Sequence, residues 1–147
     1  MSDSLHVVCP HCHATNRVLR ERLQAAPRCG GCKESLLPTY PLELNTAGFD
    51  RHLSSDDLPL VVDFWAQWCA PCRMMAPAYT QAAAELKLKA RLAKLDTEAE
   101  PDIAARYGIR SIPTLIAFSN GREIARQSGA LDLQNLLAWI RTHFRDL

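Results

Sequence analysis

The chain has 147 residues, of which 48% are hydrophobic and 22% charged, which is typical of a globular protein and excludes a disordered or collagen-like chain. Its 17 Lys and Arg nearly balance its 16 Asp and Glu, so the net charge of +1 argues against nucleic-acid and membrane partners. No run approaches the roughly 18 apolar residues of a membrane span. The N-terminus lacks the basic start and apolar stretch of a secretory signal, so we expect a cytoplasmic protein.

The six cysteines form three Cys-x-x-Cys pairs, and two of these pairs lie within the first 40 residues. A segment this short does not normally fold on an apolar core alone and needs a disulfide, a metal or a partner. The proline-containing stretch 36–41 is typical of an extended joint, because the residue before a proline avoids helical geometry. We therefore expect a small module over residues 1–38 and a larger domain over residues 39–147.

The cysteine spacing in the module is typical of a zinc ribbon with four ligands: Cys9, Cys12, Cys29 and Cys32. Two residues between ligands let one tight turn present two thiolates to a tetrahedral ion. A bound Zn²⁺ would also supply the stability that so short a segment lacks. Gly30 and Gly31 are expected to give the second turn a backbone with positive φ.

Other interpretations of the module are less well supported. The two pairs could form disulfides, but cytosolic thiols are kept reduced. Since four cysteines complete the ligand set, we expect His6, His11 and His13 to be solvated. Contact with nucleic acid has little support, because the first 40 residues carry only five Lys and Arg against three Asp and Glu and lack interleaved aromatic residues.

Hydrophobic patterning in the larger domain alternates between strand-like runs and helical spacing. Asn120-Gly121 is a strong signal for a tight hairpin between two of the strands, and Pro77 predicts a kink in the longest helix. The alternation favours an α/β domain with a mixed sheet flanked by helices. Strands are predicted at 42–44, 60–65, 91–96, 114–119 and 122–127, and helices at 46–53, 71–88, 101–107 and 133–144.

The third pair, Cys69 and Cys72, follows a buried strand and opens the longest predicted helix. A helix N-terminus stabilises a thiolate by roughly 0.3–1 kcal/mol, or up to about 2 kcal/mol when partly buried, which lowers the pKa of a cysteine by about one unit. We expect Cys69 to be the accessible attacking thiol and Cys72, deeper on the same side, to be the resolving thiol. Pro71 fixes φ where its missing N–H does no harm. A second metal site would need ligands that no further cysteine can supply.

Asp63 lies within the apolar run Val61-Val-Asp-Phe-Trp65. If its carboxyl group is buried, desolvation raises the pKa and suits a group that exchanges protons near neutrality. The alternative is an aspartate at the strand end that faces solvent. Composition and pattern do not decide between the two.

A series of motifs runs through the larger domain over about residues 42–147: Val62-Asp-Phe-Trp-Ala66, Trp68-Cys-x-Pro-Cys72, Ala76-Pro77, Ala93-Lys-Leu-Asp96, Tyr107-Gly-Ile-Arg-Ser-Ile-Pro-Thr114, Phe118-x-Asn-Gly121 and Gly129-Ala130. In these motifs and their order the domain resembles the thioredoxin family. With the four-cysteine module the chain is similar to the thioredoxin 2 type of bacteria, which implies a thioredoxin fold preceded by a zinc ribbon.

The resemblance implies a disulfide reductase and assigns roles around the dithiol. Asp63 is expected to act as general base toward Cys72, with Lys94 tuning it. A cis bond before Pro113 is expected to place Ile112 beside the dithiol, where its backbone can pair with an extended client. Trp65 and Trp68 are expected to shape the site.

The resemblance also implies partners, namely proteins that contain disulfides and an NADPH-dependent, flavin-containing thioredoxin reductase. The chain has no Gly-x-Gly-x-x-Gly fingerprint, so we expect it to bind neither nicotinamide nor flavin itself.

One position departs from the family, because Ala70 stands where glycine is usual. Alanine favours a helix interior over glycine by about 1 kcal/mol and adds a methyl group at the contact surface. This change bears on the reduction potential and the range of clients. The alternative function is a zinc-dependent redox sensor or holdase, in which oxidation would expel the metal and expose apolar surface.

Overall fold

The computed structural model describes residues 3–144, in which every strand and helix predicted for the larger domain is present. Two strands and a 3-10 helix in the N-terminal module were not predicted. None of the helices in this range is long and apolar enough to cross a membrane. In chain order the elements are β1 (Ser4–Val8), β2 (Thr15–Leu19), the 3-10 helix (Arg20–Ala25), β3 (Leu42–Glu43), α1 (Thr46–Ser55), β4 (Leu60–Trp65), α2 (Ala70–Leu86), β5 (Arg91–Asp96), α3 (Pro101–Arg106), β6 (Thr114–Ser119), β7 (Arg122–Ser128) and α4 (Leu133–His143).

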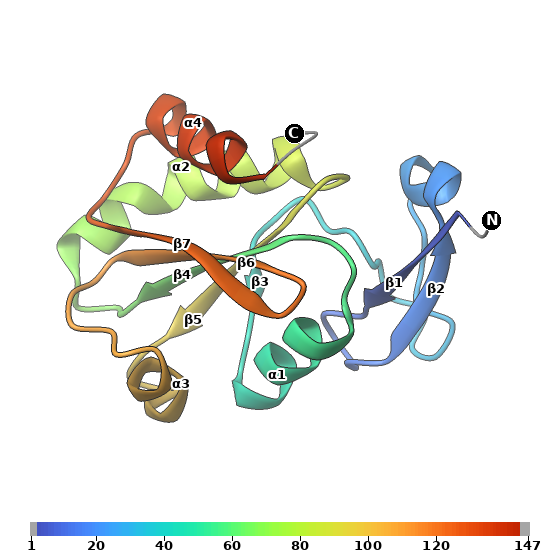
Figure 1. The fold of residues 1–147 in the computed structure, drawn as a ribbon, viewed down its shortest axis with the longest axis horizontal. Coiled ribbons are helices and arrows are strands. Elements are labelled where there is room, and N and C mark those ends of the chain that lie inside the picture. Colours follow the sequence, from blue (N-terminus) through green and yellow to red (C-terminus); the bar gives the residue numbers. More distant parts are fainter. Residues whose placement is uncertain (1–2, 145–147) are drawn as a thin grey trace.

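The larger domain is built on a five-stranded sheet with the order β3-β5-β4-β6-β7. β5 pairs in parallel with β3 and β4, whereas β6 pairs antiparallel with β4 and β7. Helices α2 and α4 cover one face of the sheet, and α1 and α3 cover the other (Figure 1). The continuous apolar run of β4 reflects its central place, because a strand that is covered on both faces has no solvated side.

Two apolar layers fill the space between the sheet and its helices. The layer under α2 and α4 includes Val61, Tyr79 and Leu115, and the layer over α1 and α3 includes Phe49 and Phe64. Because side chains alternate along a strand, successive residues of β4 enter different layers. Asp63 therefore shares its face with Val61 and points toward α2.

The N-terminal module is a two-stranded antiparallel sheet with a core of its own. The β1–β2 ladder runs from the Ser4–Leu19 pair to the Val8–Thr15 pair. The apolar residues of the module form a cluster that also takes in Leu58 and Leu88 of the larger domain. The two parts therefore share a continuous packed interface.

Polar contacts also join β1 to the loop between α1 and β4. The carboxylate of Asp57 accepts from the backbone N–H of His6, and the carboxylate of Asp56 accepts from the N–H of Val8 at 3.1 Å. Arg91, at the start of β5, lies 3.3 Å from the Asp56 carboxylate and donates to the Val8 carbonyl at 3.2 Å. The Arg91 and Asp56 side chains are each only 2% exposed, so this ion pair is buried at the interface.

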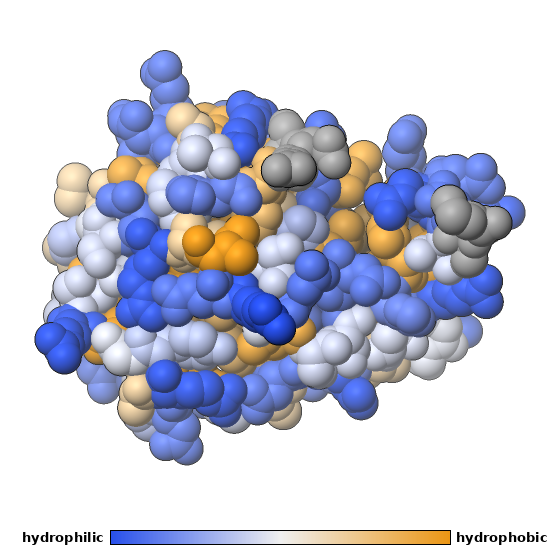
Figure 2. All heavy atoms as spheres, in the orientation of Figure 1, coloured by the Kyte–Doolittle hydropathy of each residue, from blue (hydrophilic) through white to orange (hydrophobic). Residues whose placement is uncertain are grey.

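Hydrophilic side chains cover most of the face shown in Figure 2, and hydrophobic atoms appear there as small separate areas. Few large apolar side chains are exposed in residues 3–144, and two of them are close to the dithiol in the chain: Trp68 directly precedes Cys69, and Met74 lies two residues after Cys72. Apolar side chains that are exposed singly need no partner, whereas those next to a reactive group are candidates for contact with a client.

Candidate functional site

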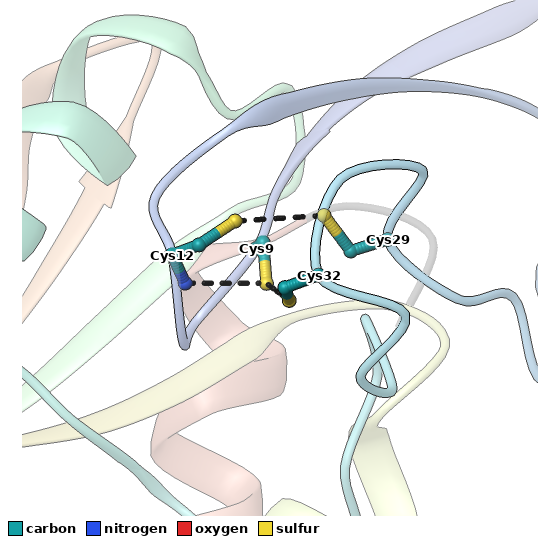
Figure 3. Close-up of side chains that lie close together, drawn as sticks. All are labelled: Cys9, Cys12, Cys29 and Cys32. Atoms are coloured by element: carbon teal, nitrogen blue, oxygen red, sulfur yellow. Dashed lines mark hydrogen bonds between the residues drawn. The ribbon is translucent and has the colours of Figure 1, made fainter.

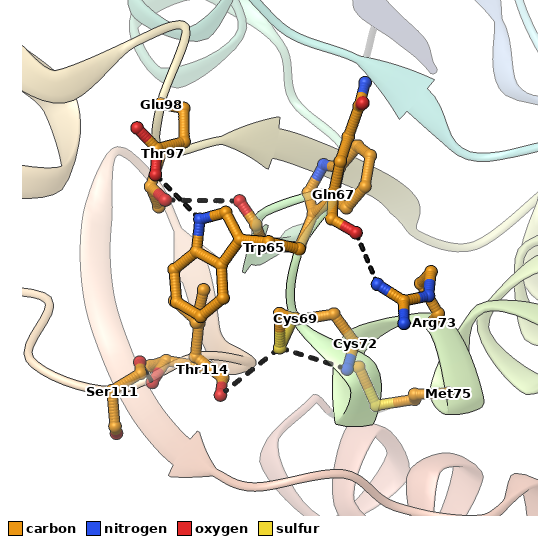
Figure 4. Close-up of a disulfide and its surroundings, with 12 residues drawn as sticks. Trp65, Gln67, Cys69, Cys72, Arg73, Met75, Thr97, Glu98, Ser111 and Thr114 are labelled. Carbon is orange, nitrogen blue, oxygen red and sulfur yellow. Dashed lines mark hydrogen bonds between the residues drawn. A yellow bond between two sulfur atoms is a disulfide. The ribbon is translucent and has the colours of Figure 1, made fainter.

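The dithiol lies at the start of α2, just after the loop that connects β4 to α2. Cys69 is the N-cap of α2, and its sulfur accepts a hydrogen bond from the backbone N–H of Cys72 at 3.2 Å. Cys69 and Cys72 form a disulfide in the structure (Figure 4). Pro71 lies in the first turn of the helix, where no N–H is needed. The predicted placement of the pair at a helix N-terminus is therefore confirmed.

The two cysteines do not differ in residue exposure as expected. Each is 3% exposed in the disulfide state, although Cys69 was expected to be the accessible one. Cys69 is less exposed than expected because the backbone around Ile112 lies against it, with the Ile112 carbonyl oxygen 3.7 Å from Cys69 Sγ. The resemblance implied that Ile112 lies beside the dithiol, 43 positions away along the chain, but not that this segment covers Cys69.

The segment that covers Cys69 contains the predicted cis bond, between Ile112 and Pro113. Thr114 stabilises the turn of this segment, because its hydroxyl donates to the carbonyl of Ser111 at 2.6 Å. In Figure 4 Thr114 lies between Ser111 and the disulfide. The arrangement leaves the Ile112 backbone close to the dithiol, where an extended chain could be held.

Asp63 is buried, with 1% exposure, so the solvent-facing alternative is wrong. Burial raises the pKa of its carboxyl group to about 7, and the nearby Lys94 opposes this shift. Asp63 and Lys94 are register partners on β4 and β5, and Lys94 Nζ lies 4.0 Å from the centre of the Trp65 ring. Asp63 Oδ1 has no hydrogen-bond partner in the described part of the chain. A carboxyl group of this kind can take up and release a proton near neutral pH.

Trp68 is the most exposed aromatic side chain at the site, at 67%. Its indole N–H donates to Glu98 Oε1 at 2.7 Å, and Glu98 is labelled in Figure 4. Trp68 also lines a shallow pocket of about 170 Å³ with Ile109, Arg110 and Ile112. Sequence reasoning missed Glu98, since no local motif indicates which carboxylate faces an indole 30 residues away.

The four cysteines of the module come together as predicted. Their sulfur atoms all lie within 4.8 Å of one another, with 3.5 Å between Cys9 and Cys32 and 3.6 Å between Cys12 and Cys29 (Figure 3). A tetrahedral zinc tetrathiolate with Zn–S bonds near 2.3 Å has sulfurs about 3.8 Å apart. The donor set and its spacing therefore fit one Zn²⁺.

Both cysteine pairs of the module sit in the same kind of turn. The residue after each pair, His13 or Lys33, has a positive φ of 64° or 69°. Its N–H donates to the carbonyl of the first cysteine, at 3.0 Å for Cys9 and 2.9 Å for Cys29. The expectation for the two glycines of the second pair is wrong, because the left-handed residue follows the second cysteine in each turn.

Hydrogen bonds within the turns favour the thiolate of Cys29, whereas the pKa values of the Cys12 and Cys32 thiols are raised. The Cys9 sulfur accepts from the N–H of Cys12, and the Cys29 sulfur accepts from the N–H of Gly31. Donors of this kind, led by the N–H of Cys32 and followed by Asn16, lower the pKa of the Cys29 thiol to about 6. A metal ligand must be deprotonated, so these donors assist binding of a cation.

The histidines of the module behave differently from one another. His6 and His11 are exposed as expected, but His13 is half-buried. A Cβ placed on Gly48 would lie 2.9 Å from His13 Nε2, so the imidazole packs directly on the first turn of α1. The expectation of a solvated His13 is therefore wrong, and this residue takes part in docking the module.

The sequence profile described as Thioredoxin matches residues 40–142. The chain belongs to the thioredoxin family. It is a protein dithiol–disulfide oxidoreductase of that family, with the cysteine pair that the chemistry requires. A second profile, the zinc ribbon described as Thioredoxin 2, N-terminal, matches residues 8–34 and covers all four cysteines of the cluster.

Individual thioredoxins are similar over most of the chain. Thioredoxin C-3 of Corynebacterium nephridii is 46% identical over 134 residues, which are 91% of this chain and 92% of that protein. The thioredoxin of Haemophilus influenzae is 38% identical over 69% of this chain and 95% of its own length. A solved mutant thioredoxin from Halobacterium salinarum NRC-1 has a TM-score of 0.67 at 30% identity and covers 75% of this chain and 96% of its own.

Proposed function

We propose that this chain reduces disulfides in client proteins, with Cys69 as the nucleophile and Cys72 as the resolving thiol. The observation that carries the proposal is the place of Cys69, at the N-cap of α2 and against the Ile112 carbonyl. Unpaired N–H groups at a helix start stabilise a thiolate there, and the helix dipole adds to the effect.

The reaction proceeds in two exchanges. The Cys69 thiolate attacks a client sulfur, the client disulfide breaks, and the other client sulfur leaves with the electron pair and takes up a proton. The Cys72 sulfur then attacks Cys69 Sγ in the mixed disulfide, and the second client sulfur leaves as a thiolate. The client gains two electrons, and the chain is left with the Cys69–Cys72 disulfide.

Asp63 is the proposed base that removes the proton from Cys72 before the second exchange. Its burial and its raised pKa of about 7 support this role, because a base works best when its pKa lies near the operating pH. Lys94 is the proposed tuning residue, since its charge favours the carboxylate.

The client is proposed to lie as an extended segment along Ile112 and Pro113, with Trp68 as one wall. Exposed Ala70 and Pro71 complete the surface around Cys69. The free backbone of an extended client can pair with the Ile112 backbone, which makes recognition independent of client side chains. This suits a reductase with many clients.

A thioredoxin reductase that draws electrons from NADPH is the proposed source of the two electrons, in the cytoplasm. The chain itself is proposed to bind neither nicotinamide nor flavin. Residues 1–38 are proposed as the zinc-ribbon module, with Cys9, Cys12, Cys29 and Cys32 holding one structural Zn²⁺, and residues 39–147 as the thioredoxin domain. No specific observation favours the redox-sensor or holdase alternative over this function.

Reduction of a protein disulfide such as that of insulin, with dithiothreitol or NADPH and a reductase as electron source, tests the proposal. Cys69→Ser should abolish turnover, and Cys72→Ser should accumulate a mixed disulfide with the client that mass spectrometry detects. Turnover by Cys69→Ser at the wild-type rate would reject the assignment, as would trapping through Cys72 instead of Cys69.

A further inference from the structure

Tyr79 places a hydroxyl group in the apolar layer between α2 and the five-stranded sheet. Its side chain is fully buried within the cluster that includes Val61 and Leu92. Phenylalanine would fill nearly the same space, so a buried tyrosine is explained only by what its hydroxyl contacts. Its single hydroxyl hydrogen is shared between two acceptors, the carbonyl of Ala93 at 2.7 Å and the carbonyl of Val61 at 3.1 Å.

The hydroxyl lies in the same buried layer as the proposed base and the dithiol. Cys72, Met75 and Tyr79 form a buried stripe along α2, with the spacing of one helix face. Asp63 faces this stripe, because it is two residues from Val61 on β4 and the side chains of a strand alternate.

The two carbonyls that accept from Tyr79 belong to the two strands that carry Asp63 and Lys94. Ala93 directly precedes Lys94 on β5, and Val61 lies two residues before Asp63 on β4. One hydroxyl therefore bridges β4 and β5 next to the paired residues Asp63 and Lys94, which are the proposed base and its proposed tuning residue.

The polar surroundings of Asp63 are few. Lys94 on β5 and Tyr79 and the dithiol on α2 are the titratable groups that face it in the described chain, and β6 offers only the apolar Leu115. Asp63 Oδ1 accepts no hydrogen bond from any residue between 3 and 144. Small changes in the local field should therefore act strongly on this carboxyl group, since little else screens it.

We propose that Tyr79 is a positioning residue for proton transfer at the dithiol: its hydroxyl hydrogen, shared by the Ala93 and Val61 carbonyl oxygens, offsets their negative charge near Asp63 and ties β4 to β5 at the register pair Asp63–Lys94. The proposal rests on the proposed role of Asp63 as the base. Tyr79 does not touch the reacting sulfurs in this scheme and acts only through Asp63.

The substitution Tyr79→Phe tests this role with little change in shape. The Ala93 and Val61 carbonyl oxygens lose the one hydrogen that they share, and their negative ends then oppose ionisation of Asp63. A looser bridge also moves Lys94 away, which acts in the same direction. The pKa of Asp63 should rise by about half a unit, which is about a threefold change in proton affinity.

The measurement is a carboxyl-carbon NMR titration of the oxidised, zinc-loaded full chain, with the Asp63 resonance assigned from Asp63→Asn. The matched control is Leu86→Val, which perturbs the same core two helical turns away and should leave the midpoint unchanged. An unchanged or lowered midpoint in Tyr79→Phe, or an equal rise in Leu86→Val, overturns the proposal.

The pH profile of client reduction separates this proposal from the proposed function. Tyr79→Phe should shift the acidic limb of the profile to higher pH. In the Asp63→Asn background the same substitution should leave the profile unchanged. If Asp63→Asn itself leaves the profile unchanged, Asp63 is not the base and the proposed function fails at that step. The NMR titration would still report whether Tyr79 acts on Asp63.

Discussion

The two kinds of Cys-x-x-Cys pair in this chain share a spacing and differ in backbone. Cys69 caps a 17-residue helix, and the residues that follow Cys72 continue that helix. In the module, each pair is followed at once by a left-handed residue that closes a tight turn. The helix leaves two cysteines to face each other, whereas two such turns bring four sulfurs together. In this chain the conformation after the second cysteine distinguishes the redox pair from the two metal-binding pairs, which all share one spacing.

The largest expected effect comes from removing one sulfur of the cluster. Cys29→Ser should weaken zinc binding by more than the about 10–100-fold lost with outer-shell partners, because a ligand itself is gone. Competition with a chromogenic chelator measures the affinity, and insulin reduction measures the dithiol. Cys72→Ser is the matched control and should retain the metal. If Cys29→Ser bound zinc like the wild type, the four-cysteine site would be wrong.

The interface between the two regions should be the next most sensitive feature. Arg91→Met leaves the Asp56 carboxylate buried without its partner, and breaking such a pair costs about 3–5 kcal/mol of stability. Urea unfolding of the zinc-loaded chain measures the loss. Arg106→Met is the control, since its pair with Asp50 is about half exposed and should contribute less than about 1 kcal/mol. Equal losses in the two variants would contradict a buried, coupled interface.

The dithiol region should show its own signature in the pH dependence of stability. The pKa of Asp63 is about 7 in the folded chain and 3.8 in the reference state, so the folded state binds the extra proton between these values and loses stability as the pH rises through them. Asp63→Asn should flatten this slope and be more stable at pH 8, by up to about 4 kcal/mol.

Thermal unfolding from pH 4 to pH 8 measures the slope, with the exposed Glu85→Gln as control. A variant Asp63→Asn that keeps the full wild-type slope would show that Asp63 does not carry it.

The smallest expected effect concerns the turn of the active helix. Ala70→Gly restores the residue usual in the family and should lower stability by at most about 1 kcal/mol, because Ala70 lies at the exposed start of α2. The reduction potential, measured against a glutathione buffer, should change while zinc affinity does not. A change in zinc affinity would mean that the two regions are coupled through α2.

The sequence predicted local features of both sites well. The strands and helices of the larger domain, the position of Cys69 at a helix start and the gathering of four cysteines follow from periodicity and spacing. The burial of Asp63 needed the structure, because its strand pattern fits either face. The roles of Arg91, Glu98 and Tyr79 depend on contacts between distant parts of the chain. The strands β1 and β2 were missed because their apolar pattern is short and interrupted by polar residues.

Arg91 has a consequence for any attempt to shorten this protein. Cutting away the first 38 residues would strip the cover from a guanidinium–carboxylate pair and from Leu58 and Leu88, whose neighbours lie largely in the removed part. The remaining fragment would expose to water apolar side chains and a charged pair that are buried in the full chain. If such a fragment lost solubility, the newly exposed surface would explain the loss. The result would therefore say nothing about what the zinc ribbon does for catalysis.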